Sequence, residues 1–142
     1  MKIALDAFPL TGRITGIGRY VLEICSVLDR LIPEAEFLLY SPKPLAVELP
    51  SERWRSRIGG DWTVSSYIWL KTVVTPMAEA DGAQAFWATR TILPSRSSRF
   101  RTVATVHDLN YKVLPTSMPY LTLLAHRFWF ERDLHRDRKS VV

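Results

Sequence analysis

Two glycines in the stretch TGIGRY have the spacing of a loop that brings backbone amides close to a ligand. Gly16 and Gly18 lie between a short apolar run and a stretch with helical periodicity. The N–H groups at the start of a helix attract anions, and a glycine lacks the β-carbon that would keep a phosphate away. A turn that needs a positive φ also favours glycine, so the residues alone leave both interpretations open. Neither common nucleotide loop matches, because Val21 occupies the third small position of the dinucleotide fingerprint and Arg19-Tyr20 replaces the P-loop Lys-Ser/Thr.

A histidine and an aspartate in the stretch TVHDLN form the second candidate site. His107 and Asp108 stand where a predicted strand should end, so we expect them at the same sheet edge as the glycine loop. A histidine there can hydrogen-bond a sugar hydroxyl or transfer a proton, since its ordinary pKa is about 6.5. Asp108 would orient the ring or cap the next turn, and a structural histidine is the alternative. Asp6 ends the first strand on this rim, where an Asx turn is a simpler role than catalysis.

The elements that must position these residues alternate between strand and helix patterns. The predicted strands are 2–7, 36–41, 84–88 and 101–109. The predicted helices run from Gly18 until Pro33, over 67–80 with a kink or new start at Pro76, and over 115–134. The segment 42–62 is rich in proline and glycine, which predicts a surface excursion. The alternation predicts one α/β domain, 1–142, with a doubly wound, mostly parallel sheet and helices on both faces.

Composition excludes several other classes of protein. The chain has 142 residues, of which 47% are apolar and 23% charged, as in one globular domain. Its single cysteine, Cys25, excludes an internal disulfide and is expected in the core. No run approaches the roughly 18 apolar residues of a membrane span, so a cytoplasmic location is expected. His126 and His135 are not at a metal-binding spacing, and no metal is expected.

The net positive charge of the chain indicates which kinds of partner it can bind. The formal net charge is +5, and four arginines gather in RTILPSRSSRFR, at Arg90, Arg96, Arg99 and Arg101. Such a patch favours phosphate, anionic lipid or nucleic acid, and a solvated basic loop is the alternative. Basic and aromatic residues do not alternate as in a single-strand binder, so no nucleic-acid partner is expected.

Several stretches together resemble the amino-terminal domain of family-4 glycosyltransferases of the GT-B type. They are MKIALDAFPLTGRITGIGRYVLEICSVL, EFLLYSPKP, AFWATRTILP, VATVHDLNYKVLPTSMP and RFWFERDL. The resemblance covers nearly the whole chain, is weakest over 45–65, and is greatest to the mannosyltransferase-like branch that builds bacterial surface polysaccharides. It implies a Rossmann-like domain that holds the acceptor and faces a donor-binding domain across a cleft.

The resemblance also implies roles for individual residues. The two glycines correspond to the loop that approaches the donor diphosphate. His107 corresponds to the histidine that lies near the transferred sugar and its developing charge, and Asp108 to the neighbouring acid that orients it. Asp6 and Arg19 are the acceptor-side candidates on the same rim.

The implied reaction moves a hexose such as mannose from a nucleotide-sugar co-substrate to a polysaccharide or lipid-linked acceptor, with retention and without a metal or other cofactor. The donor domain is expected to be absent, and the chain alone inactive, because transition-state stabilisation needs both walls of the cleft. A separate donor-domain chain and peripheral contact with the anionic inner membrane face are the expected partnerships. Two alternatives stay open: a non-catalytic module that binds a sugar-phosphate or a partner, and a basic nucleic-acid or membrane-surface protein on an unrelated α/β fold.

Overall fold

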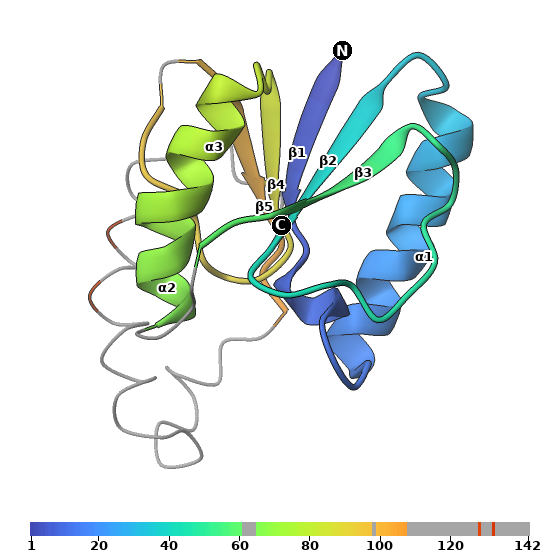
Figure 1. Cartoon of the computed structure of the whole chain (residues 1–142), viewed down its shortest axis with the longest axis horizontal. Helices are drawn as coiled ribbons and strands as arrows, with labels where there is room; N and C mark the ends of the chain where they lie inside the picture. The colour runs from blue at the N-terminus through green and yellow to red at the C-terminus, as the bar shows by residue number, and fades with distance from the viewer. Residues whose placement is uncertain (61–64, 98, 108–127, 129–131, 133–142) are drawn as a thin grey trace.

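Five parallel strands form one sheet in the computed structural model, which describes residues 1–60, 65–97, 99–107, 128 and 132 (Figure 1). The strands are β1 (Lys2–Asp6), β2 (Glu36–Ser41), β3 (Trp54–Ile58), β4 (Ala85–Ala88) and β5 (Arg101–Ala104). Their order across the sheet is β3-β2-β1-β4-β5, and every neighbouring pair is parallel. This is the strand order of a doubly wound α/β fold, and the predicted Rossmann-like class is confirmed.

All four predicted strands form, but β5 ends at Ala104, whereas the predicted strand continues to 109, and the prediction that 42–62 is a surface excursion is wrong for 54–58. Residues 54–58 of that segment form β3, which pairs with β2 at one end of the described sheet. Within β3 only Trp54 is buried, and the next four residues are exposed. An exposed strand at the end of a sheet needs few apolar residues, and the sequence WRSRI therefore gave no strand signal.

Helices cover both faces of the sheet. Helix α1 (Gly16–Leu31) lies on one face, and α2 (Ser66–Trp69) and α3 (Thr75–Ala80) lie on the other (Figure 1). A π-helical turn, η2 (Leu70–Val74), joins α2 to α3, and the backbone stays helical through it. Pro76 stands in the first turn of α3, which begins at Thr75, so the predicted new start at this proline is confirmed as a change from π-helix to α-helix. The predicted helix over 115–134 lies outside the described residues, apart from 128 and 132.

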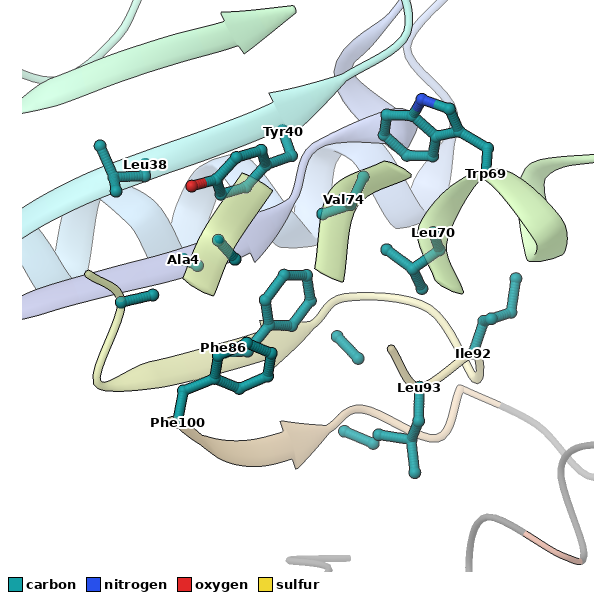
Figure 2. Packing of buried hydrophobic residues seen from close by; sticks show 14 residues of the cluster. Ala4, Leu38, Tyr40, Trp69, Leu70, Val74, Phe86, Ile92, Leu93 and Phe100 are labelled. Atoms are coloured by element: carbon teal, nitrogen blue, oxygen red, sulfur yellow. The ribbon is translucent and has the colours of Figure 1, made fainter. Parts of the chain in front are cut away.

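The alternation of side chains along the strands divides the core into two clusters. Ala4 of β1 pairs with Leu38 and Phe86 of its neighbours, and all three pack under α2, η2 and α3 (Figure 2). The next residue, Leu5, faces the α1 cluster instead. Cys25 is buried in that second cluster, where burial raises the pKa of its thiol to about 12. The prediction that it is a core residue is confirmed.

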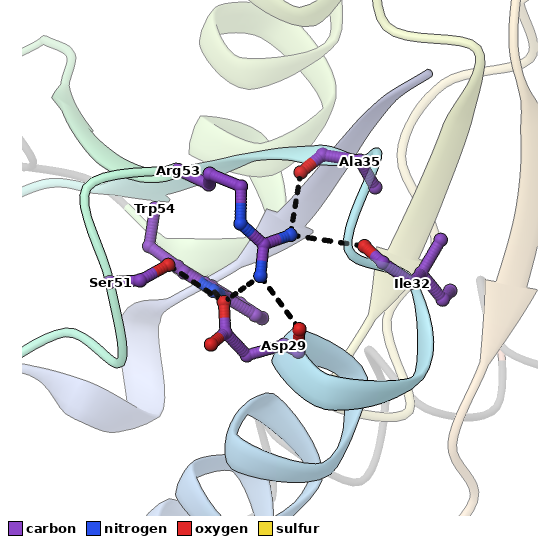
Figure 3. Close-up of polar contacts among 6 residues, drawn as sticks. All are labelled: Asp29, Ile32, Ala35, Ser51, Arg53 and Trp54. Atoms are coloured by element: carbon purple, nitrogen blue, oxygen red, sulfur yellow. Dashed lines mark hydrogen bonds and ion pairs between the residues drawn. The ribbon is translucent and has the colours of Figure 1, made fainter.

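Asp29, near the end of α1, anchors the helix to the β3 region. Its Oδ1 accepts hydrogen bonds from the Ser51 hydroxyl (2.7 Å), Arg53 Nη2 (2.6 Å) and Trp54 Nε1 (2.7 Å). Arg53 also donates to the main-chain carbonyl of Asp29 and to two backbone carbonyls that follow α1 (Figure 3). The bond from Ser51, then that from Trp54 and the charge of Arg53, lower the pKa of the Asp29 carboxyl. The cluster is therefore most stable with this carboxyl ionised.

Replacing Asp29 by asparagine tests this cluster through its pH dependence. Because the folded-state pKa is lowered, Asp29 stabilises the fold above its unfolded pKa of about 3.9, and this contribution is lost as the pH falls through the lower folded-state value. We expect Asp29→Asn to be less stable than the wild type at pH 7, with the difference shrinking below about pH 4. Urea unfolding at a series of pH values measures it. The exposed Glu34→Gln serves as the matched control and should follow the wild-type curve, and a difference for Asp29→Asn that does not change with pH would contradict the assignment.

Candidate functional site

The carboxyl ends of β1 and β4 meet at the point where the strand order reverses, and β5 lies beside β4. From β1 the chain proceeds through α1 to β2 on one side, and β4 is followed by β5 on the other. In open α/β sheets such a switch point leaves a crevice outside the strand ends, where ligands bind. The residues that end these strands, together with the first turn of α1, therefore define the candidate site, which we call the switch-point rim: Asp6, 15–20, 89–90 and 105–107.

A buried ion pair joins the ends of β1 and β4 at this rim. Asp6 is fully buried, and its Oδ2 accepts a hydrogen bond from Arg90 Nε at 2.7 Å. Its Oδ1 accepts one from the backbone N–H of Phe8 at 3.1 Å, which confirms the predicted Asx turn. The Arg90 guanidinium also lies 4.3 Å from the centroid of the Phe8 ring. Both carboxylate oxygens of Asp6 thus serve the structure of the rim.

The four arginines of RTILPSRSSRFR do not form one patch. Arg90 is mostly buried against Asp6, whereas Arg96, Arg99 and Arg101 are exposed. Among the described residues, Nη2 of Arg90 is buried and has no hydrogen-bond partner. Only the three exposed arginines are available to an anionic surface.

His107 lies at the rim beside the start of α1. Its Nε2 is 2.8 Å from the carbonyl oxygen of Thr89, and its ring meets that of Tyr20 edge-on, with centroids 5.3 Å apart. Tyr20 follows the glycine loop by two residues and is half-exposed. The structure therefore brings the imidazole and the first turns of α1 together on one side of the sheet, as the sequence predicts.

The two glycines of the loop differ in what surrounds them. A β-carbon added at Gly18 would lie 2.7 Å from the carbonyl oxygen of Pro9 and 3.0 Å from Cγ2 of Ile14, so this position is closed by the chain itself. A β-carbon at Gly16 would meet nothing within 4 Å. Neither glycine has a positive φ, in contrast to Gly12, so the positive-φ interpretation is wrong for both. Close approach to a ligand fits Gly16, and close packing explains Gly18.

The remaining predicted site residues are less involved in the rim. Arg19 is exposed in the first turns of α1, and no hydrogen bond or ion pair engages its side chain within the part of the chain that is described. Asp108 lies outside the described residues. The Thr15 side chain makes no capping bond, and the first turn of α1 carries no acidic residue, so its first amides face the rim without a local carboxylate.

Sequence reasoning missed the residues that hold the rim together. Thr89 is fully buried, and its hydroxyl donates to the backbone carbonyl of Asp6 at 2.6 Å. Trp87 Nε1 donates to the Thr105 hydroxyl at 2.9 Å, which joins the ends of β4 and β5. Their position in the sequence could have identified two of these residues, because Thr89 and Arg90 directly follow the predicted strand 84–88. Polar residues just after a buried parallel strand lie at the ligand-binding edge.

The rim thus offers an imidazole, open backbone amides and exposed arginine, a set that suits a ligand with hydroxyl or phosphate groups. Within the described ranges no three His, Cys, Asp or Glu side chains are grouped so as to hold a metal ion. No described helix has the length and apolar character needed to cross a membrane. No protein-family model, curated protein or solved structure matches the chain.

The Asp6–Arg90 pair is expected to carry a large share of the stability of the rim. Asp6→Asn keeps an oxygen for the Phe8 amide but leaves the guanidinium buried without a counter-charge, which costs about 3–5 kcal/mol. The double variant Asp6→Asn, Arg90→Met removes the orphaned charge and should recover most of that loss. Urea unfolding measures both, and a single variant as stable as the wild type would show that the pair contributes nothing.

Replacing each glycine by alanine distinguishes the glycine that close packing requires, Gly18, from the one that lies in open space, Gly16. Gly18→Ala forces a β-carbon against the Pro9 carbonyl and should lower the free energy of unfolding by about 1–3 kcal/mol. Gly16→Ala is the matched control, in the same helical turn but in open space, and should be at least as stable as the wild type, because alanine lowers the entropy of the unfolded chain. Equal stability of the two variants in urea unfolding would contradict the packing assignment of Gly18.

Proposed function

We propose that the chain is the acceptor-side domain of a GT-B glycosyltransferase. In this proposal it supports transfer of a hexose, such as mannose, from a nucleotide-sugar to a polysaccharide or lipid-linked acceptor, with retention. The observation that carries the proposal is the position of His107, whose ring contacts Tyr20 and so lies beside the first turns of α1 at the switch point. The resemblance of the sequence to family-4 glycosyltransferases supplies the reaction.

The chemistry of the rim is compatible with that reaction. Sugar transfer needs partners for hydroxyl groups and for the negative charge that develops on the leaving diphosphate. The half-buried imidazole of His107 serves the first need, and the first amides of α1, which the Thr15 side chain does not cap, serve the second. In this proposal a donor-binding domain closes the rim, excludes water and brings the nucleotide-sugar, so no metal is required in the described site. Asp108 would orient the ring in its imidazolium form, in which both nitrogens carry a proton, and Arg19 would meet the acceptor.

The same proposal gives the exposed arginines a role. Arg96, Arg99 and Arg101 are accessible on the part of the chain that leads from β4 into β5. A lipid-linked acceptor lies at an anionic surface, and each arginine near such a surface contributes about 1 kcal/mol of attraction. We therefore propose that the chain works on the cytoplasmic side, in peripheral contact with the inner membrane face.

A non-catalytic module that binds a sugar-phosphate is the second candidate. The state of Asp6 favours it, because both carboxylate oxygens are already held by Phe8 and Arg90 and the group is fully buried. A carboxylate that is fully engaged cannot act as a general base, whereas the rim retains the groups that bind a sugar-phosphate. The two candidates differ in whether transfer accompanies binding.

The experiment combines the chain with a donor-binding GT-B domain, supplied in trans or as a fusion. Radiolabelled nucleotide-hexoses and a polyprenyl-linked acceptor are added, and transfer to the acceptor is counted. We expect His107→Ala to lower turnover by about 100-fold or more, because it removes a positioned acid–base group. Ser26→Ala, exposed on the outer side of α1, is the matched control and should leave turnover unchanged.

The outcomes separate the candidates. Wild-type turnover in His107→Ala would remove this residue from the mechanism and the proposal with it. Saturable binding of sugar-phosphates without transfer from any nucleotide-hexose would favour the binding module. Binding that ignores sugars and collapses with added salt would instead indicate a basic surface protein.

A further inference from the structure

The contact between His107 and Thr89 determines which ring nitrogen can face a ligand. Nε2 of His107 lies 2.8 Å from the backbone carbonyl oxygen of Thr89. A carbonyl oxygen has no proton to donate, so the hydrogen bond forms only when Nε2 carries the proton. In the neutral ring Nδ1 then keeps its lone pair. Among the described residues, no hydrogen bond engages Nδ1.

Thr89 is itself held on two sides. Its side chain is fully buried, and its hydroxyl donates to the carbonyl oxygen of Asp6 at 2.6 Å. The next residue, Arg90, binds the carboxylate of the same Asp6 at 2.7 Å. The peptide that presents the Thr89 carbonyl is therefore attached to the end of β1 through both its own side chain and its neighbour.

We infer that Thr89 is a positioning residue, which holds His107 in the tautomer protonated on Nε2 and leaves Nδ1 as the ring nitrogen that meets the ligand. The edge-on contact with Tyr20 restricts rotation of the same ring. Thr89 acts through its carbonyl and is not itself a catalytic residue. The inference rests on the proposed function only for the identity of the ligand.

The tautomer of His107 determines which ligand groups can form a hydrogen bond with its Nδ1. A lone pair on Nδ1 accepts a hydrogen bond from a hydroxyl and repels a phosphate oxygen. If a hydroxyl proton moves to Nδ1, the ring becomes an imidazolium that still donates from Nε2 to Thr89. The hydrogen bond is then charge-assisted and stronger. The neutral ring therefore belongs against a sugar hydroxyl, and the open amides at Gly16 remain the better place for phosphate.

The test reads the tautomer directly, by nuclear magnetic resonance of the ¹⁵N-labelled full chain in mildly alkaline buffer, and it compares the two tautomers of the neutral ring. Long-range ¹H–¹⁵N spectra of the wild type should show the His107 proton on Nε2. In Thr89→Val, which keeps the shape but loses the hydroxyl, the Thr89 carbonyl loses one of its two attachments, and the fraction protonated on Nδ1 should rise, by up to about fivefold if the Nε2 hydrogen bond of roughly 1 kcal/mol is lost with it. Thr89→Ser restores the hydroxyl and should restore the wild-type spectrum.

Three results would overturn the inference: a wild-type proton on Nδ1, a folded Thr89→Val with the wild-type tautomer ratio, or a Thr89→Ser that does not rescue. Should Thr89→Val not fold, scalar coupling across the Nε2–H···O=C hydrogen bond in the wild type decides the matter, because its absence refutes the contact. Titration with a sugar acceptor separates this inference from the proposed function. An Nδ1 signal that no sugar shifts would count against the function and leave the role of Thr89 standing.

Discussion

A fully buried carboxylate is the constraint on which the rest of the rim depends. Asp6 ends the central strand β1 with no exposure to solvent, and an unpaired charge in that position would cost several kcal/mol. Arg90 at the end of β4 supplies the counter-charge, and the Phe8 amide supplies a further hydrogen bond. The ion pair therefore joins the ends of the two strands at the switch point. It also holds the first residues after β4 against the end of β1.

The position of α1 follows from a second contact, between backbone segments. Gly18 allows the helix to approach the Pro9 carbonyl so closely that a β-carbon would not fit. The inner face of α1 then packs on the sheet through Val21 and Cys25. The same placement puts Tyr20 on the rim, where it contacts His107. A packing requirement and a candidate functional contact thus share one turn of helix.

The two ends of α1 have different tasks. At its carboxyl end Asp29 is engaged by three side chains of the β3 region, and the cluster stabilises an edge of the domain away from the switch point. At its amino end the first amides remain uncapped by Thr15 and Gly16 lies open. One end of the helix is thus held by a dense set of hydrogen bonds, and ligand chemistry is expected at the end where backbone amides are left uncapped.

The sequence by itself determined the class of fold, because buried parallel strands and amphipathic helices have periodicities that the residues display. It also determined the rim location of Asp6 and His107, since Asp6 ends an apolar strand and His107 stands where another is predicted to end. The tertiary structure alone decided that residues 54–58 form a strand, because an exposed end strand carries little apolar signal. Only the structure paired Asp6 with Arg90 and His107 with Thr89, because these partners are 84 and 18 residues apart and meet only when β1, β4 and β5 align. The local pattern of apolar and polar residues predicts which face of an element a side chain occupies. The partner of that side chain depends on how strands far apart in the sequence pair in the sheet.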